Sequence, residues 1–109
     1  MIPVTLAQLA RDCDGQVVGS PTTLISDVST DTRTVTPGAI FAAIKGERVD
    51  GATLSGQALE NGASAILTSE PVTAVACGGK PEDIVVVDDV QGAIGKLSRA
   101  NLVRVRESG

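Results

Sequence analysis

The stretch AIFAAIKGERVDGATLSGQALENGASAILT, residues 39–68, predicts a strand, a helix and a second strand in succession. Its first six residues, 39–44, form a short continuous apolar run, as expected for a strand covered on both faces. Residues 51–61 then place apolar side chains at helical spacing, and Gly62 follows at the position that favours glycine after a helix. Residues 63–68 form a second apolar strand. Two buried strands joined by a helix imply a parallel pair in a layered α/β domain.

The segment before this stretch predicts one helix and two short strands. Thr5 and Gln8 form a capping box at the start of the helix, and Gly15 marks its end. Residues 16–19 and 24–29 are the candidate strands that follow.

The segment after it predicts a loop, a strand and a last helix. Residues 69–83 contain two prolines and two glycines, and we interpret them as an irregular loop. Residues 84–87 are the clearest strand because all four are β-branched. Asp88 and Gln91 form a second capping box before the last helix. The expected fold is therefore a single α/β/α domain over residues 1–109, with a small, largely parallel sheet.

Composition and charge exclude several classes of function. The chain has 109 residues, a net charge of −4 and a single aromatic residue, a Phe. A nucleic-acid partner is not expected, because such proteins carry a basic excess and aromatic stacking platforms. Membrane insertion is not expected either, because the chain has no apolar run of spanning length and no signal peptide.

The residue inventory also argues against catalysis by this chain. It contains no histidine, the commonest general base and the commonest metal ligand. It contains no phosphate-binding loop of the type G-x-x-x-x-G-K-[ST]. Cys13 and Cys77 are too far apart in the sequence to suggest a metal site, and we interpret them as free thiols. The residues alone predict a domain that binds a ligand, with no catalytic residue and no metal site.

The candidate binding residues lie in two polar loops, each of which follows an apolar strand. The first is residues 30–33 and the second is residues 45–50. In open α/β sheets ligands bind beyond the carboxyl ends of the strands, and arginine and lysine hold phosphate or carboxylate groups. The alternative is that both loops are ordinary solvated turns, with Asp31 and Arg33 paired locally and the two threonine hydroxyls capping the first turn.

These loops carry a family resemblance. The segments STDTR (residues 29–33) and PGAIFAAIKGERVDG (residues 37–51) resemble the N-terminal domain of Mur ligases. The segments ALENGASAIL (residues 58–67) and VVVDDV (residues 85–90) resemble later, less specific parts of that domain. One departure is that Ala52 and Leu54 stand where the family often has His and Phe.

The resemblance implies a three-domain cytoplasmic enzyme of peptidoglycan synthesis. Such an enzyme uses ATP and magnesium to join D-alanyl-D-alanine to UDP-N-acetylmuramoyl-tripeptide through an acyl phosphate. The resemblance favours this member over the one that adds the third amino acid of the peptide. The chain matches the UDP-binding domain, so the central ATP-binding and C-terminal domains are absent from it. We expect the isolated chain to be monomeric, free of cofactors and inactive as a ligase, with its own central domain as a missing partner.

The resemblance also assigns the UDP-binding residues by position. Thr32 matches a hydroxyl residue near the uracil, and residues 46–48 match a loop that packs on the base. The full set is Thr30, Asp31, Thr32, Arg33, Lys45, Gly46, Glu47 and Arg48. Two other interpretations stay open: an α/β module that binds another phosphorylated small molecule, and an interaction domain with no small-molecule role.

Overall fold

The computed structural model describes residues 3–33, 35–44, 51–79 and 83–99, and within them a five-stranded sheet forms the centre of the molecule. The strand order is β2-β7-β6-β5-β4. Strands β4 to β7 are mutually parallel, whereas β2 pairs antiparallel with β7 at one edge. The predicted α/β/α fold with a largely parallel sheet is confirmed. The strands are β2 (Gln16–Gly19), β4 (Asp27–Ser29), β5 (Ala39–Ala42), β6 (Ala65–Thr68) and β7 (Asp83–Val86).

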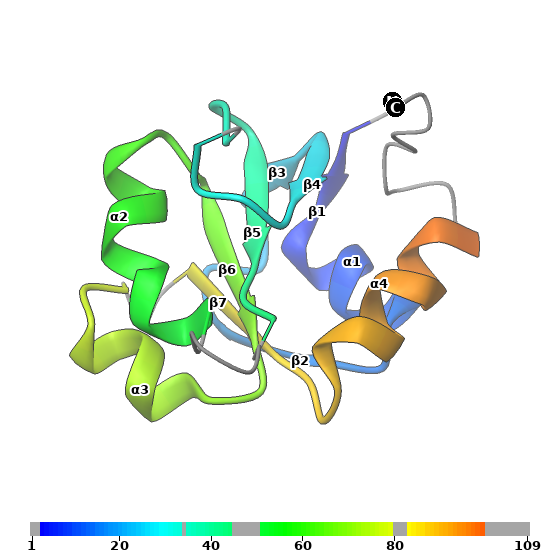
Figure 1. The fold of residues 1–109 in the computed structure, drawn as a ribbon. Helices are drawn as coiled ribbons and strands as arrows, with labels where there is room; N and C mark the ends of the chain where they lie inside the picture. Colours follow the sequence, from blue (N-terminus) through cyan, green and yellow to red (C-terminus); the bar gives the residue numbers. More distant parts are fainter. Residues whose placement is uncertain (1–2, 34, 45–50, 80–82, 100–109) are drawn as a thin grey trace.

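Helices cover both faces of this sheet (Figure 1). One face carries α1 (Leu6–Asp12) and α4 (Val90–Arg99), and the other carries α2 (Ser55–Glu60) and α3 (Pro71–Ala76). The expected helix over residues 51–61 is present, but its first turn is a 3₁₀ helix, η1 (Gly51–Leu54). None of the helices in the described residues is long and apolar enough to cross a membrane.

Strand β5 lies between two hydrophobic clusters. Ile40 and Ala42 point into the cluster beneath α1 and α4, whereas Phe41 and Ala43 point into the cluster beneath α2 and α3. Alternation of side chains along a strand places successive residues on opposite faces. All four residues of β5 are buried, which is why the segment has no polar alternation in the sequence.

A predicted helix start and a predicted helix end are confirmed, and a turn is observed at Gly38. The Thr5 side chain accepts a hydrogen bond of 3.2 Å from the backbone N–H of Gln8 at the start of α1. Gly62 has φ +116° after α2, and the N–H of Ala63 donates to the carbonyl of Ala58, a glycine-ended helix terminus. Gly38 has φ +92° in the turn closed by the bond from Ala39 N to Thr36 O.

The single strand predicted over residues 24–29 is wrong, because the chain changes sheets at Ser26. β3 (Leu24–Ile25) pairs with β1 (Val4–Thr5) in a separate two-stranded sheet, and β4 begins at Asp27. The backbone N–H of Ser26 donates to the carbonyl of Gly38 at 2.8 Å between the two pairings.

The irregular loop predicted over residues 69–83 is also corrected, because it contains α3. Pro71 is the first residue of this helix, where its missing N–H costs nothing and its fixed φ is suited to helix. Gly78, with φ +102°, ends the helix, and the N–H of Gly79 donates to the carbonyl of Ala74 at 2.8 Å. Pro71 and the two glycines therefore delimit a helix.

The second capping box, predicted from Asp88 and Gln91, is wrong, because the helix begins one residue later and its third position is Gly92, which has no side chain to complete a box. α4 begins at Val90, and the carbonyl of Asp89 accepts the first helical bond, from the N–H of Ala93 at 2.9 Å. Asp89, not Asp88, therefore occupies the N-cap position.

Candidate functional site

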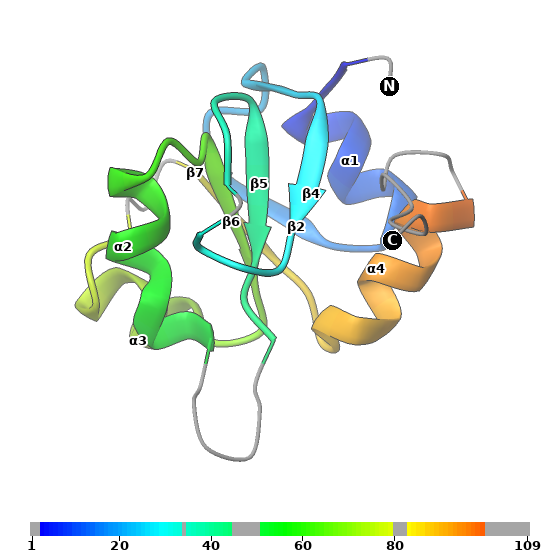
Figure 2. The same ribbon diagram turned by 45° about the horizontal axis from the view of Figure 1, so that its top comes forward.

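The carboxyl ends of β4, β5, β6 and β7 lie along the same side of the sheet, because these strands are parallel. We call this side, where the strands end, the carboxyl edge of the sheet. Figure 2 shows the arrowheads of β4 and β5 pointing the same way. Residues 30–33, directly after β4, therefore lie at this edge, as the sequence predicts. The other half of the predicted site, Lys45, Gly46, Glu47 and Arg48, lies outside the described residues.

The loop after β4 is shaped by hydrogen bonds to its own side chains. The Ser29 hydroxyl donates to the carbonyl of Asp31 at 3.0 Å and accepts from its N–H at 3.3 Å. An Asp31 carboxylate oxygen accepts from the backbone N–H of Arg33 at 2.8 Å. This last bond is an Asx-turn, in which an aspartate side chain replaces a backbone carbonyl. The alternative interpretation expects the hydroxyls of Thr30 and Thr32 to cap this turn. In the part of the loop that the structure describes, the side chains of Ser29 and Asp31 make the capping bonds.

The local pairing of Asp31 with Arg33 is confirmed. The guanidinium donates to both carboxylate oxygens, at 3.2 and 2.9 Å. These bonds lower the pKa of the Asp31 carboxyl and raise the pKa of the Arg33 guanidinium. The Arg33 side chain is still 85% exposed, so its remaining N–H groups face solvent at the carboxyl edge of the sheet. Local pairing and ligand contact are therefore compatible at this side chain.

Thr32, assigned by resemblance to the uracil contact, is only 7% exposed. Its carbonyl accepts a 2.8 Å hydrogen bond from the side-chain amide of Asn61, at the end of α2. Asn61 is not among the residues predicted for the site, because an Asn-Gly pair after a helix is typical of an ordinary helix end. Nothing in the sequence pattern connects it with a residue 29 positions earlier.

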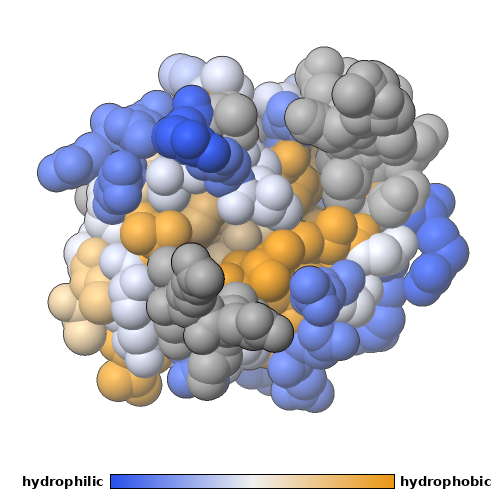
Figure 3. Space-filling model, in the orientation of Figure 1, coloured by the Kyte–Doolittle hydropathy of each residue, from blue (hydrophilic) through white to orange (hydrophobic). Residues whose placement is uncertain are grey.

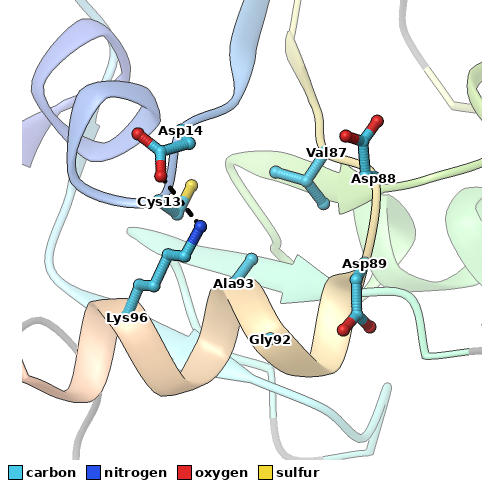
Figure 4. Close-up of a pocket in the computed structure, with 8 residues that line it drawn as sticks. All are labelled: Cys13, Asp14, Val87, Asp88, Asp89, Gly92, Ala93 and Lys96. Carbon is cyan, nitrogen blue, oxygen red and sulfur yellow. Dashed lines mark hydrogen bonds and ion pairs between the residues drawn. The ribbon is translucent and has the colours of Figure 1, made fainter.

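A pocket of about 200 Å³ opens elsewhere, between the end of α1, the residues after β7 and the first turns of α4 (Figure 4). Lys96 and Asp14 form an ion pair of 2.8 Å across it. The three carboxylates of the pocket outnumber its single ammonium group, which makes it a poor site for a phosphate. Its lining residues are Cys13, Asp14, Val87, Asp88, Asp89, Gly92, Ala93 and Lys96.

The thiol of Cys13 in this pocket is not poised for reaction. Burial is the main cause that raises the pKa of Cys13, so the unreactive protonated form is favoured at neutral pH. Both cysteines are free, as expected. In the described part of the chain, no three His, Cys, Asp or Glu side chains gather in a group that would hold a metal ion.

Comparison with known proteins identifies the family. A family profile described as "Mur ligase family, catalytic domain" matches residues 24–101. The chain belongs to the Mur ligase family. The matched span of this Mur ligase chain includes all eight candidate residues.

Relatives of two kinds match this Mur ligase chain. UDP-N-acetylmuramoyl-tripeptide--D-alanyl-D-alanine ligase of Escherichia coli is 41% identical over 98 residues, which cover 90% of the chain and 20% of the relative. UDP-N-acetylmuramoyl-L-alanyl-D-glutamate--2,6-diaminopimelate ligase of Phocaeicola vulgatus is 30% identical over 89 residues, which cover 76% of the chain and 16% of the relative. The chain thus spans about a fifth of the length of these curated relatives.

Solved structures agree with the fold. A crystal structure of MurF from Acinetobacter baumannii superposes with a TM-score of 0.69 and 30% sequence identity, over 89% of this chain and 20% of that chain. The Mur ligase chain therefore has the fold of a MurF segment, as the resemblance implied.

Proposed function

We propose that this chain is the UDP-recognition domain of a MurF-type ligase, which joins D-alanyl-D-alanine to UDP-N-acetylmuramoyl-tripeptide. The observation that carries the proposal is the loop at residues 30–33. It lies at the carboxyl edge of a parallel sheet, holds an internally bonded turn and exposes the Arg33 guanidinium. Ligands of open α/β sheets bind at this edge, and arginine suits phosphate groups.

The ligase reaction requires more than this chain. The relatives are about five times longer than the segment that matches, so we propose that ATP and magnesium bind in the remaining part. The role of this chain is then to hold the uridine diphosphate end of the substrate, through Thr30, Asp31, Thr32 and Arg33 together with Lys45, Gly46, Glu47 and Arg48. A cytoplasmic location follows from such a substrate.

Calorimetric titration with UDP tests the role of the loop. Arg33→Ala should weaken binding about ten- to a hundredfold, the effect of losing one charge-assisted hydrogen bond. Arg11→Ala is the matched control, since Arg11 is also exposed and its side chain bonds to Gln8 within its own helix. Equal affinities for wild type and both variants would remove Arg33 from the site. Equal losses in both variants would indicate nonspecific attraction of the anion.

The second candidate is a diaminopimelate-adding, MurE-type ligase, because such proteins also match the chain. The D-alanyl-D-alanine ligase of Escherichia coli matches at higher identity and over more of the chain, which favours the MurF type. The two activities differ in the amino component, so ligase assays on the full gene product discriminate them. Product formed with D-alanyl-D-alanine supports the first candidate, and product formed with diaminopimelate supports the second.

A further inference from the structure

The turn between α2 and β6 contacts the connection from β4 to β5 at three points. The side-chain amide of Asn61 donates to the carbonyl of Thr32 at 2.8 Å. Gly62 lies next to Pro37, and an added Cβ would be in van der Waals contact with the proline ring at 3.4 Å. The Ser64 hydroxyl accepts a bond of 3.0 Å from the backbone N–H of Gly38. Both ends of residues 32–38 are thus attached to one short turn.

The Asn61 side chain starts from a well-fixed backbone. The N–H of Asn61 donates to the carbonyls of Gln57 and Ala58, and Ala63 N–H closes the helix end on Ala58. The helix therefore sets the direction of the amide before it reaches the loop. Ala58 itself is fully buried in the cluster beneath α2 and α3, which anchors this end of the helix to the sheet.

The bond from Asn61 connects the loop to another element of the fold, whereas the bonds among Ser29, Asp31 and Arg33 join residues close in the sequence. Ser29, Asp31 and Arg33 bond to one another and determine the shape of the turn. Those bonds join neighbours in the sequence, whereas Asn61 ties the middle of the loop to a different element of the fold. The contact fixes where Thr32 lies relative to the sheet, and therefore where its two charged neighbours are presented.

We propose that Asn61 is a positioning residue for ligand recognition by residues 30–33. It holds the Thr32 carbonyl so that the loop keeps its binding geometry before the ligand arrives, which reduces the ordering cost of binding. Asn61 carries no charge, so it acts through geometry and not through attraction of the anion. This inference rests on the proposed function, because it assumes that the loop contacts uridine diphosphate.

The test compares UDP affinity, loop spectra and stability in three variants of the 109-residue chain. Asn61→Ala and Asn61→Leu both remove the amide donor, and Leu nearly preserves the side-chain volume. Gln57→Ala is the matched control, since Gln57 is an exposed, uncharged amide one turn earlier in α2. Nitrogen-15 NMR spectra report the amides of Thr32 and Arg33, UDP titration gives Kd, and thermal melting gives Tm.

Both Asn61 variants should weaken UDP binding about three- to tenfold, the fold-change that one lost neutral hydrogen bond produces. The free variants should also show displaced amide signals at Thr32 and Arg33, while Gln57→Ala matches wild type in affinity and spectrum. A loss of affinity that follows Tm across all three variants would indicate a general structural role and overturn the inference. Wild-type affinity in both Asn61 variants would overturn it while leaving the proposed function intact. Failure of the wild-type chain to bind UDP would overturn both.

Discussion

The Arg33 guanidinium donates to both carboxylate oxygens of Asp31, two residues earlier in the chain, with Nη2 2.9 Å from Oδ2. The Arg33 side chain is exposed and the Asp31 side chain is partly exposed, so the pair shapes the surface of the loop and adds little to stability. The bidentate geometry instead fixes the orientation of the guanidinium plane at the edge of the sheet.

The first prediction concerns the titration of Asp31. Its pKa should lie below the ordinary aspartate range, because the hydrogen bond from Arg33 favours the charged carboxylate. A lowered folded-state pKa means that the stabilising interaction is present above the unfolded pKa and lost as pH falls through the folded pKa. Carbon-13 NMR of the carboxyl groups measures it. Arg33→Ala should raise the Asp31 pKa and leave that of Asp14, which bonds to Lys96, unchanged. An unchanged Asp31 titration in that variant would contradict the ion pair.

The second prediction concerns Phe41, the single aromatic residue, which is 1% exposed at the centre of the sheet. Phe41→Ala should lower the free energy of unfolding by about 3–5 kcal/mol, because it leaves a cavity in the cluster beneath α2 and α3. Phe41→Leu should cost less, about 1–2 kcal/mol, and keeps the comparison measurable if the alanine variant does not fold. Urea denaturation gives both values. Equal losses for the two variants would argue against a cavity.

The third prediction contrasts two helical glycines. A Cβ on Gly56 would lie 2.6 Å from the carbonyl oxygen of Cys77, whereas a Cβ on Gly95 would meet no atom within 4 Å. Gly56→Ala should therefore destabilise the chain by about 1–3 kcal/mol, because the backbones of α2 and the end of α3 must separate. Gly95→Ala in α4 should stabilise it by about 0.5–1 kcal/mol through helix propensity. Thermal melting of both variants measures the contrast, and shifts of the same sign would show that the close approach is wrong.

The fold was predictable where local pattern and packing agree. The apolar run of β5 and the N-cap at Thr5 each determine their own element, and both occur as the sequence indicates. The other half of the predicted capping box is different, because the Gln8 side chain donates to Asp12 and accepts from Arg11 within the helix. Helix α3 was not predictable in the same way, because Val72 and Val75 are exposed and leave no inward-facing periodicity. Figure 3 shows this apolar surface as orange at the lower left, over α3.

The candidate site was also predictable from the sequence only in part. The position of residues 30–33 at the carboxyl edge follows from the order of strands along the chain. The partner of Thr32 does not, because the contact with Asn61 depends on how the end of α2 packs on the sheet. A hydrogen bond between residues 29 positions apart is a product of the tertiary structure and leaves no periodic signal.

Nucleotide specificity tests the central claim most directly. In nitrogen-15 NMR titrations of the chain, UDP-N-acetylmuramic acid and UMP should shift the amides of residues 30–33 and 46–48, and AMP should not. Such a result would establish recognition of the uridine end of the substrate. Equal shifts with AMP would indicate generic phosphate binding, and the absence of shifts at millimolar uridine ligand would contradict the assignment of this chain as a UDP-recognition domain.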